Sequence, residues 1–299
     1  MCQYWQAAGK YNWRINEKMS GKFSGYQKKK EYLVCVDSDG CAMDTMDIKH
    51  IRCFGPCMVK QWKLERWQDE ILKRWNEINL YTMTRGINRF KGLAMALQEI
   101  DQKYCQIKDL DTLAKWVDTT QELSNDALKT AIERNVGSIS LGEALAWSNA
   151  VNTAITELPD EEKKPFGNVK EALEYAHRYA DVAIVSSANK GAVLEEWERY
   201  GLLEHTDIVL AQDAGTKAFC IGELLKYGYD QEKVLMCGDA PGDLKAAEQN
   251  GVCYYPILVR HEAESWKEFM EKGLDYLLSG SYGKGYHKMK IQEFMENLR

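Results

Sequence analysis

Five short apolar runs constrain the fold of this 299-residue chain more than any other feature. Each is rich in β-branched or aromatic residues and is bounded by polar residues or turn signals, which predicts strands of a buried parallel sheet. The runs are YLVCV (32–36), VAIVS (182–186), DIVLA (207–211), KVLMCG (233–238) and VCYYPI (252–257). Helical segments lie between them, so the repeated order is strand, helix, strand. We therefore expect an α/β fold, a Rossmann-like doubly wound parallel sheet that binds ligands at the carboxyl ends of its strands.

A stretch of about 120 residues, from about 47 to 165, separates the first run from the second and has no comparable strand signal. Apolar residues recur there at helical intervals. They are Leu64, Trp67, Ile71, Trp75 and Ile78; Leu110, Leu113, Ala114 and Val117; and Leu141, Ala144 and Leu145, followed by Ser148. We expect an inserted all-helical domain whose aromatic side chains form its core.

These patterns divide the chain into four expected parts. Residues 28–46 and 166–260 are expected to form a discontinuous Rossmann-like core, and residues 47–165 the helical insertion. Residues 1–27 show no sustained period and are expected to be an extension on the surface of the fold. Residues 261–299 are expected to be a helical segment packed on the core.

Charge and hydropathy argue against two classes of partner. The formal net charge is -6, and the run of three lysines at 28–30 is too short to bind nucleic acid. No apolar stretch approaches the roughly 20 residues that span a bilayer, and the N-terminus lacks the apolar run of a signal peptide. We expect a cytoplasmic protein that binds neither nucleic acid nor a membrane.

The cysteines are expected to be reduced thiols. Nine of them are scattered along the chain, an odd number without a compact framework. Cys53 and Cys57 have the spacing of a zinc ligand pair, but no second Cys or His pair accompanies them. We expect both to be ordinary buried or half-buried thiols.

The loop after the first run holds Asp37, Ser38, Asp39 and Gly40. Two aspartates two residues apart can face one ligand, and such a pair is costly unless a cation lies between them. By itself the pattern also fits a structural turn or a calcium loop.

Two further polar residues follow later strands. Ser186 ends the second run and is followed by Ser187; a serine between a strand and a helix is most often a helix cap. Lys217 lies near the start of a predicted helix, where its charge opposes the helix dipole. An exposed lysine is the ordinary alternative.

A second pair of aspartates, Asp239 and Asp243, follows the fourth run in the sequence CGDAPGDLKAA. Carboxylates from two loops at the same edge of a sheet supply the hard oxygen ligands that suit Mg²⁺. This pair therefore predicts a magnesium site.

Together these segments resemble the four motifs of the haloacid dehalogenase superfamily, in the same order and with similar spacing. The matching segments are DSDG, VAIVSS, GTK and GDAPGDLKAAEQNGV, and they cover about residues 30–46 and 166–260. DTMDIKH resembles the place where inserted caps begin, and FGNVKEAL resembles the segment where the chain re-enters the core. The resemblance implies the phosphatase branch, with a helical cap inserted after the first motif.

The resemblance also implies a role for each residue. Asp37 would be the nucleophile, and Asp39 would donate a proton to the leaving oxygen and then accept one from the attacking water. Ser186 and Lys217 would hold the phosphoryl oxygens. The implied cofactor is Mg²⁺, held by Asp37, Asp239 and the backbone carbonyl of Asp39, with Asp243 supporting the metal.

Asp39 distinguishes between branches of this superfamily. A leaving halide needs no proton, so a second aspartate favours phosphate chemistry over dehalogenation. A phosphomutase and a phosphonatase remain alternatives, the latter through a Schiff base for which Lys49 is a candidate. A different class of function, a binding or regulatory protein on an inactive core, would be expected to lack Asp37, Asp39, Lys217 or Asp239, and all four are present.

The expected substrate is a small phosphorylated metabolite. The sequence identifies neither this metabolite nor the oligomeric state of the protein. The cap sequence TRGINRFKG (84–92) contains Arg85, Asn88, Arg89 and Lys91, which could clamp an acidic substrate or form a solvated basic helix face. Gly40, Asp44, Arg85, Arg89 and Ser187 are the predicted substrate-binding residues. Lys49 and His50 follow Asp44 closely and are candidates to line the cap entrance.

Overall fold

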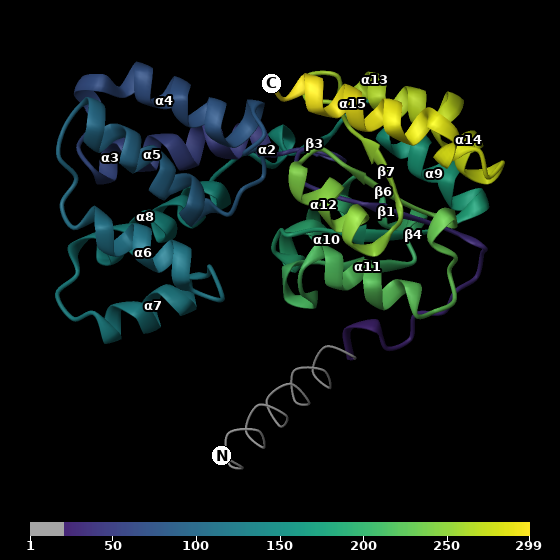
Figure 1. Ribbon diagram of the computed structural model, residues 1–299, viewed down its shortest axis with the longest axis horizontal. Helices are drawn as coiled ribbons and strands as arrows, with labels where there is room; N and C mark the ends of the chain where they lie inside the picture. Colours follow the sequence, from purple (N-terminus) through teal and green to yellow (C-terminus); the bar gives the residue numbers. More distant parts are fainter. Residues whose placement is uncertain (1–20) are drawn as a thin grey trace, which may run out of the picture. The chain divides into compact units, whose positions relative to one another are not determined.

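The computed structural model describes residues 21–299, and these form two compact units (Figure 1). Of the described residues, one unit contains 21–43 together with Lys164–Asn297, and the other contains Asp44–Lys163 and Leu298–Arg299. The chain leaves the first unit at β2 (Met43–Asp44) and returns at β3 (Lys164–Pro165), which together form a two-stranded sheet. The first 20 residues of the predicted N-terminal extension lie outside the described part of the chain.

All five apolar runs form strands of one parallel sheet. The strands are β1 (Tyr32–Val36), β4 (Ala180–Val185), β5 (Ile208–Leu210), β6 (Val234–Gly238) and β7 (Cys253–Pro256). Their order is β5-β4-β1-β6-β7, so the first strand is the central one and the chain winds outward from it in both directions. The prediction of a doubly wound α/β core is confirmed.

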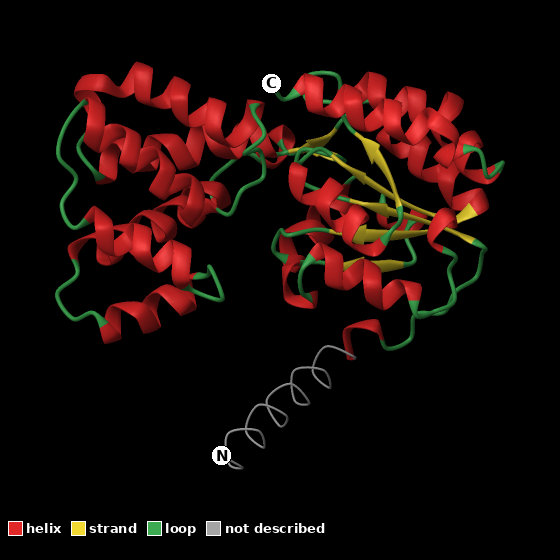
Figure 2. Ribbon diagram, viewed as in Figure 1, coloured by secondary structure: helices red, strands yellow, loops and turns green. Residues whose placement is uncertain are grey.

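Helices cover both faces of this sheet (Figure 2). They are α9 (Val169–Tyr179), α10 (Lys190–Arg199), α11 (Lys217–Leu225) and α12 (Pro241–Asn250). Apolar side chains of α9 and α10 share one buried cluster with Val34, Val182 and Leu235 of the sheet. α11 and α12 pack on each other, and α12 contacts β6 and β7. Because the inner strands are buried on both faces, they read as continuous apolar runs in the sequence, whereas Ile208 and Val209 of the edge strand β5 are only partly buried.

The C-terminal segment contributes to the same core. It contains α13 (Glu262–Glu268), α14 (Leu274–Leu278) and α15 (His287–Asn297), with a π-helical turn at Phe269–Gly273 and a kinked segment at Tyr282–Tyr286, where Gly285 has φ +110°. Trp266, Phe269 and Leu274 are fully buried in the cluster that covers β1 and β4. α15 packs along β7.

The segment that leads into β1 is less exposed than its sequence suggests. Phe23 and Tyr26 are buried, although this part of the chain was expected to lie on the surface. The backbone amides of Lys29 and Lys30 donate to the carboxylate of Asp181, which is fully buried at the start of β4. A buried carboxylate needs hydrogen-bond donors, and these two amides supply them to Asp181. The backbone of the lysine run is therefore fixed to the start of β4.

The second unit consists of helices packed around aromatic side chains. The helices are α2 (Met46–Lys49), α3 (Gly55–Gln61), α4 (Gln68–Asn76), α5 (Arg89–Lys103), α6 (Leu110–Thr119), α7 (Asn125–Arg134) and α8 (Ile139–Thr156), with π-helical turns at His50–Phe54 and Glu77–Tyr81. Phe54, Trp75, Phe90 and Trp147 are buried together in its core. The predictions of a helical insertion and of a core role for its aromatic residues are confirmed.

The helical spacing predicted for residues 64–78 is interrupted at its start. Leu64 is buried, but a 3-10 turn at Glu65–Trp67 precedes α4. Lys63, just before this turn, has φ +58°. Trp67, directly before α4, has φ -124° and ψ 21°, which is not an α-helical conformation, so the α-helix begins only at Gln68.

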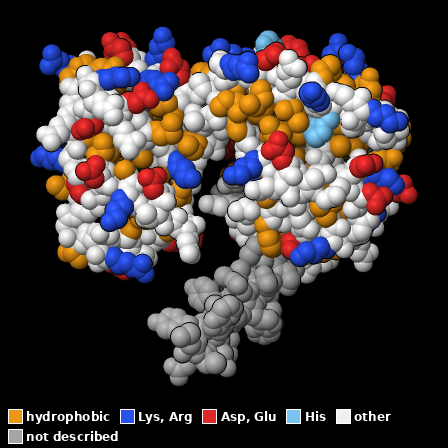
Figure 3. All heavy atoms as spheres, viewed as in Figure 1, with side chains coloured by type: hydrophobic (Ala, Val, Ile, Leu, Met, Phe, Trp, Pro, Cys, Tyr) orange, Lys and Arg blue, Asp and Glu red, His pale blue; other side chains and the backbone are white. Residues whose placement is uncertain are grey.

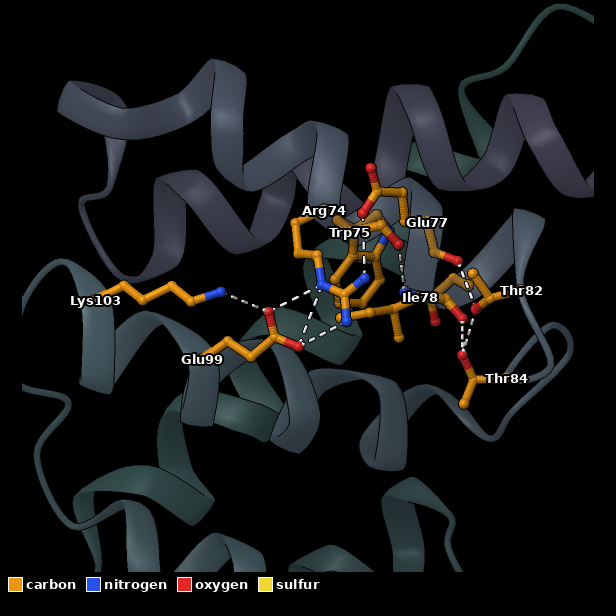
Figure 4. A network of polar contacts seen from close by, with 9 residues as sticks. Arg74, Trp75, Glu77, Ile78, Thr82, Thr84, Glu99 and Lys103 are labelled. Carbon is orange, nitrogen blue, oxygen red and sulfur yellow. Dashed lines mark hydrogen bonds and ion pairs between the residues drawn. The ribbon is translucent and has the colours of Figure 1, made fainter. Parts of the chain in front are cut away.

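A polar network joins α4 to α5 on the outside of this unit (Figure 4). The guanidinium group of Arg74 donates to both carboxylate oxygens of Glu99, at 2.8 and 2.9 Å, and to Glu77 at 3.1 Å. The hydroxyls of Thr82 and Thr84 donate to the backbone oxygens of Glu77 and Ile78, in the π-helical turn. These bonds satisfy carbonyls that a helix end leaves unpaired.

Charges of both signs are interspersed over the described part of each unit, on the face shown in Figure 3. Among the described residues, no helix combines the length and the apolar character that crossing a membrane requires.

Replacement of Asp181 tests the anchor of the lead-in segment. Asp181→Ala removes the acceptor of two backbone amides and of the Tyr229 hydroxyl, so we expect the free energy of unfolding to fall by about 2–4 kcal/mol. Urea unfolding followed by fluorescence measures the change. Asp230→Ala, at an exposed aspartate, is the control; equal losses for the two variants would contradict the anchor.

Candidate active site

The sheet order brings three of the predicted loops together. β1 is paired with β4 on one side and with β6 on the other, and Val36 lies opposite both Ile184 and Cys237. The next residues along these strands lead to Asp37, Ser186 and Asp239. Because the strands are parallel, all three loops leave the same edge of the sheet, at the point where the winding direction reverses.

Three carboxylates meet at this edge. Oxygen atoms of Asp37, Asp239 and Asp243 all lie within 4.8 Å of one another, and the three residues are buried. Like charges so close together, away from water, are unfavourable unless a cation is near them. This cluster joins two loops that are about 200 residues apart in the sequence.

Lys217 supplies one positive charge. Its ammonium group lies 2.8 Å from Asp37 Oδ2 and 2.5 Å from Asp243 Oδ1. It is the first residue of α11, and the preceding Thr216 caps this helix by accepting a hydrogen bond from the Phe219 amide. The cost of a lysine at a helix N-terminus is offset here by two carboxylates.

The pKa values reflect this crowding. Burial raises the pKa of Asp37 to about 6; Lys217 opposes this rise, and Asp243 adds to it. Burial also raises the pKa of Asp243, again against the effect of Lys217. Burial alone would lower the pKa of Lys217, but Asp243 and Asp37 together raise it, so this side chain stays charged.

The donor set fits a hard divalent cation. Three carboxylates and one ammonium group leave a formal charge of -2 when all are ionised. Mg²⁺ is usually bound by one or two carboxylates, with the remaining positions left for water and phosphate. Asp37 and Asp239 would hold the ion, and Asp243, whose two oxygens accept from Lys217 and from the Ala240 amide, would support the site.

The loop that carries Asp37 and Asp39 folds back on itself. The carbonyl of Ser38 accepts hydrogen bonds from the amides of Cys41, Ala42 and Met43, at 3.3, 3.0 and 2.8 Å. Gly40 has φ +81°, a conformation that glycine adopts more readily than other residues, and its amide donates to the carbonyl of Met43. This tight return leaves Asp39 half-buried, one residue from the buried Ser38.

Ser186 is not the cap of the following helix. Asn189 caps α10, since its side chain accepts from the amides of Gly191 and Ala192. The Ser186 hydroxyl accepts from the amide of Ala188 at 3.2 Å and is buried, whereas Ser187 is exposed. Ser186 therefore remains available as a hydroxyl donor next to the loop of Asp37.

Comparison with known proteins identifies the family. A sequence profile described as haloacid dehalogenase-like hydrolase matches residues 87–256, more than half of the chain. The chain belongs to this family of hydrolases. A comparison with curated proteins finds no match.

Two of the solved structures to which the chain is similar have related descriptions. A haloacid dehalogenase-like family hydrolase from Xanthomonas campestris has 11% sequence identity and a TM-score of 0.49, with 85% of this chain and 97% of that chain covered. A haloacid dehalogenase-like family hydrolase from Streptococcus pneumoniae has 11% identity and a TM-score of 0.43, with coverage of 79% and 90%.

In this haloacid dehalogenase-like hydrolase, some predicted site residues lie inside the range matched by the family profile, and others are supported by the geometry alone. The matched range includes Ser186, Lys217, Asp239 and Asp243. It begins after Asp37 and Asp39, so the place of the first loop in the site rests on the sheet order and on the carboxylate cluster.

The predicted substrate residues of the helical unit are engaged within that unit. Arg85 is almost fully buried and donates to the carbonyl of Leu80 at 2.8 Å. Arg89 donates to Ser148 and Asn152, its guanidinium lies 4.9 Å from the ring centre of Phe54, and burial lowers its pKa. These contacts explain why both arginines are present without a substrate, and neither forms a solvated basic face.

The other candidates of the helical unit differ in exposure. Asp44 is exposed. Lys49 and His50 are both buried, and the imidazole ring of His50 stacks on Phe54 at 4.5 Å. Asn88 caps α5 by accepting from the Phe90 amide, and Lys91 is exposed. The structure gives His50 and Asn88 structural contacts that their sequence positions did not indicate.

The sequence did not point to several buried residues that contact the site loops. Ser38 accepts a hydrogen bond from the indole of Trp197, and Trp266 donates to the carbonyl of Cys41. Only the position of Ser38 between two aspartates could have indicated its importance. The tryptophans lie far away in the sequence and carry no motif.

Replacement of Gly238 tests the close packing behind Asp243. A Cβ atom at Gly238 would lie 2.3 Å from both Cβ and Cγ of Asp243, which is held by Lys217 and by the Ala240 amide. We expect Gly238→Ala to lower the free energy of unfolding by about 1–3 kcal/mol, because Asp243 must move. Urea unfolding measures this change.

Gly242→Ala is the matched control, since a Cβ there meets nothing within 4 Å inside α12. Alanine should stabilise that helix position by up to about 1 kcal/mol. Changes of the same sign in both variants would show that Gly238 is not closely packed against Asp243.

Proposed function

We propose that this hydrolase is a Mg²⁺-dependent phosphatase that cleaves a small phosphate monoester. The observation that carries the proposal is the buried cluster of Asp37, Asp239 and Asp243 with Lys217 at the carboxyl ends of β1 and β6. A site with excess negative charge and one fixed ammonium group suits a cation together with an anionic ester. When bound, Mg²⁺ would neutralise charge between the ester and the carboxylates.

In this proposal Asp37 attacks phosphorus. Its carboxylate displaces the alcohol and forms an aspartyl phosphate, which water then hydrolyses to inorganic phosphate; two displacements replace one difficult step. Lys217 already lies within 2.8 Å of Asp37 and would stabilise the phosphoryl oxygens with the Ser186 hydroxyl.

Asp39 is proposed as the proton donor and acceptor. It lies two residues from the nucleophile on the loop that Gly40 folds back, and it is half-buried rather than part of the carboxylate cluster. It would protonate the leaving oxygen in the first step and accept a proton from water in the second. Its backbone carbonyl is a further proposed ligand for the metal.

The helical unit is proposed to select the substrate. Asp44, Arg85 and Arg89 stay candidate substrate residues, although the two arginines already have partners within the unit. A panel of sugar, nucleotide and small-acid phosphates, with NMR detection of isomeric products, would identify the substrate and separate a phosphatase from a phosphomutase.

The direct test is hydrolysis of p-nitrophenyl phosphate. We expect activity with Mg²⁺, loss of activity in EDTA, and a fall by a factor of about 10³ or more in Asp37→Asn. The control variant is Asp126→Asn, at an aspartate whose side chain is 89% exposed, and it should hydrolyse p-nitrophenyl phosphate at the wild-type rate. Unchanged hydrolysis by Asp37→Asn would overturn the proposed nucleophile.

The role of Asp39 has a separate kinetic signature. We expect Asp39→Asn to lower steady-state turnover about 10²- to 10⁴-fold, because the second step loses its base. p-Nitrophenol is a good leaving group, so the first step should persist and release a burst of about one equivalent per enzyme. Stopped-flow absorbance measures the burst; slow turnover without one would assign Asp39 to some other role.

A further inference from the structure

Three buried aromatic side chains donate hydrogen bonds to the two loops that carry the carboxylate cluster. The indole N–H of Trp197, on α10, donates to Ser38 Oγ at 2.9 Å, and that of Trp266, on α13, donates to the Cys41 carbonyl at 3.0 Å. The hydroxyl of Tyr254, on β7, donates to the Gly238 carbonyl at 2.9 Å. All three side chains are fully buried.

The two tryptophans contact the first loop on either side of its turn. Ser38 lies between Asp37 and Asp39, and Cys41 follows Gly40, where the chain folds back. Tyr254 fixes the carbonyl directly before Asp239. Each bond therefore ends next to a proposed catalytic or metal-binding residue.

These bonds do more than satisfy buried donors. A buried indole N–H needs an acceptor, and any carbonyl of a helix or strand would serve. Here the acceptors belong to an irregular loop, and the two indole groups add bonds from other elements to the loop's own turn hydrogen bonds. Small displacements of reacting groups lower rates steeply, by about 10²-fold for about 1 Å.

We propose that Trp197 and Trp266 are positioning residues for the loop of Asp37 and Asp39. The C-terminal segment, through Trp266, is thus part of the machinery that aligns the nucleophile. This inference rests on the proposed phosphatase function for its kinetic readout, whereas its effect on Mg²⁺ binding can be measured without any substrate.

The test compares three tryptophan-to-phenylalanine variants of the full chain. Trp197→Phe and Trp266→Phe keep a ring in the core and lose one hydrogen bond each. Trp147→Phe is the matched control, because Trp147 is also fully buried and donates to a backbone carbonyl, that of Phe54, at 3.1 Å in the helical unit. Melting temperatures should fall by similar amounts in all three variants.

We expect kcat for p-nitrophenyl phosphate to fall about tenfold or more in Trp197→Phe and Trp266→Phe, with a smaller change in KM. Calorimetric titration with Mg²⁺ alone should show about tenfold weaker binding in the same two variants. Trp147→Phe should keep the wild-type kcat and Mg²⁺ affinity. If all three variants have equal kcat and Mg²⁺ affinity, the tryptophans only fill the core and the proposal is wrong.

A double-mutant cycle tests the hydrogen bond between Trp197 and Ser38 by removing its acceptor as well as its donor. Ser38→Ala removes the acceptor without changing the tryptophan, so it tests the same bond even if Trp197→Phe does not fold. Ser38→Ala should lower kcat and Mg²⁺ affinity as Trp197→Phe does, and the double variant should be no worse than either single one. Wild-type activity and Mg²⁺ affinity in Ser38→Ala, or additive losses in the double variant, would exclude this hydrogen bond as the source of the effect.

The two proposals fail in different ways. A wild-type protein that cleaves no phosphate ester would contradict the phosphatase function, while the Mg²⁺ titrations of the same variants would still test the positioning role. Activity in the wild type with no separation between Trp147→Phe and the other two variants would contradict only the positioning role.

Discussion

The ion pairs of Lys217 with Asp37 and Asp243 are the contacts on which the arrangement of this site depends. They place one cation against two members of a buried cluster of three carboxylates, which would otherwise repel one another. The contact is possible because α11 follows the strand next to β4, so its first residue reaches the edge where β1 and β6 end. In the proposed function, the negative charge that remains would favour binding of a divalent cation.

Much of the core was predictable because its strands are buried on both faces. Such strands read as uninterrupted apolar runs, and the residue after each run marks the edge where ligands bind. Asp37, Ser186 and Asp239 could be found in this way from the sequence alone. The exact starts of the helices were harder to predict, because one or two backbone angles decide where a helix begins. The 3-10 turn before α4 and the capping of α10 by Asn189 are examples.

The partners of several residues could not be read from the sequence. Arg85 and Arg89, which stay candidate substrate residues, donate to Leu80, Ser148 and Asn152 inside the helical unit. Trp197 and Trp266 belong to no motif, and their indole groups contact the loop of Asp37 from more than 150 residues away. No local pattern encodes such contacts, since they depend on how distant elements pack.

The position of the insertion also shapes how the chain can fold. β1 is the central strand of the sheet and is synthesised first, but its neighbours begin only at Ala180 and Val234. The whole helical unit is therefore made while this apolar strand has no partner. Helical units with local contacts form rapidly, whereas distant parallel pairings form slowly. The helical unit can thus complete its own core on the ribosome before the sheet closes, and the unpaired central strand is the segment most exposed to aggregation during that interval.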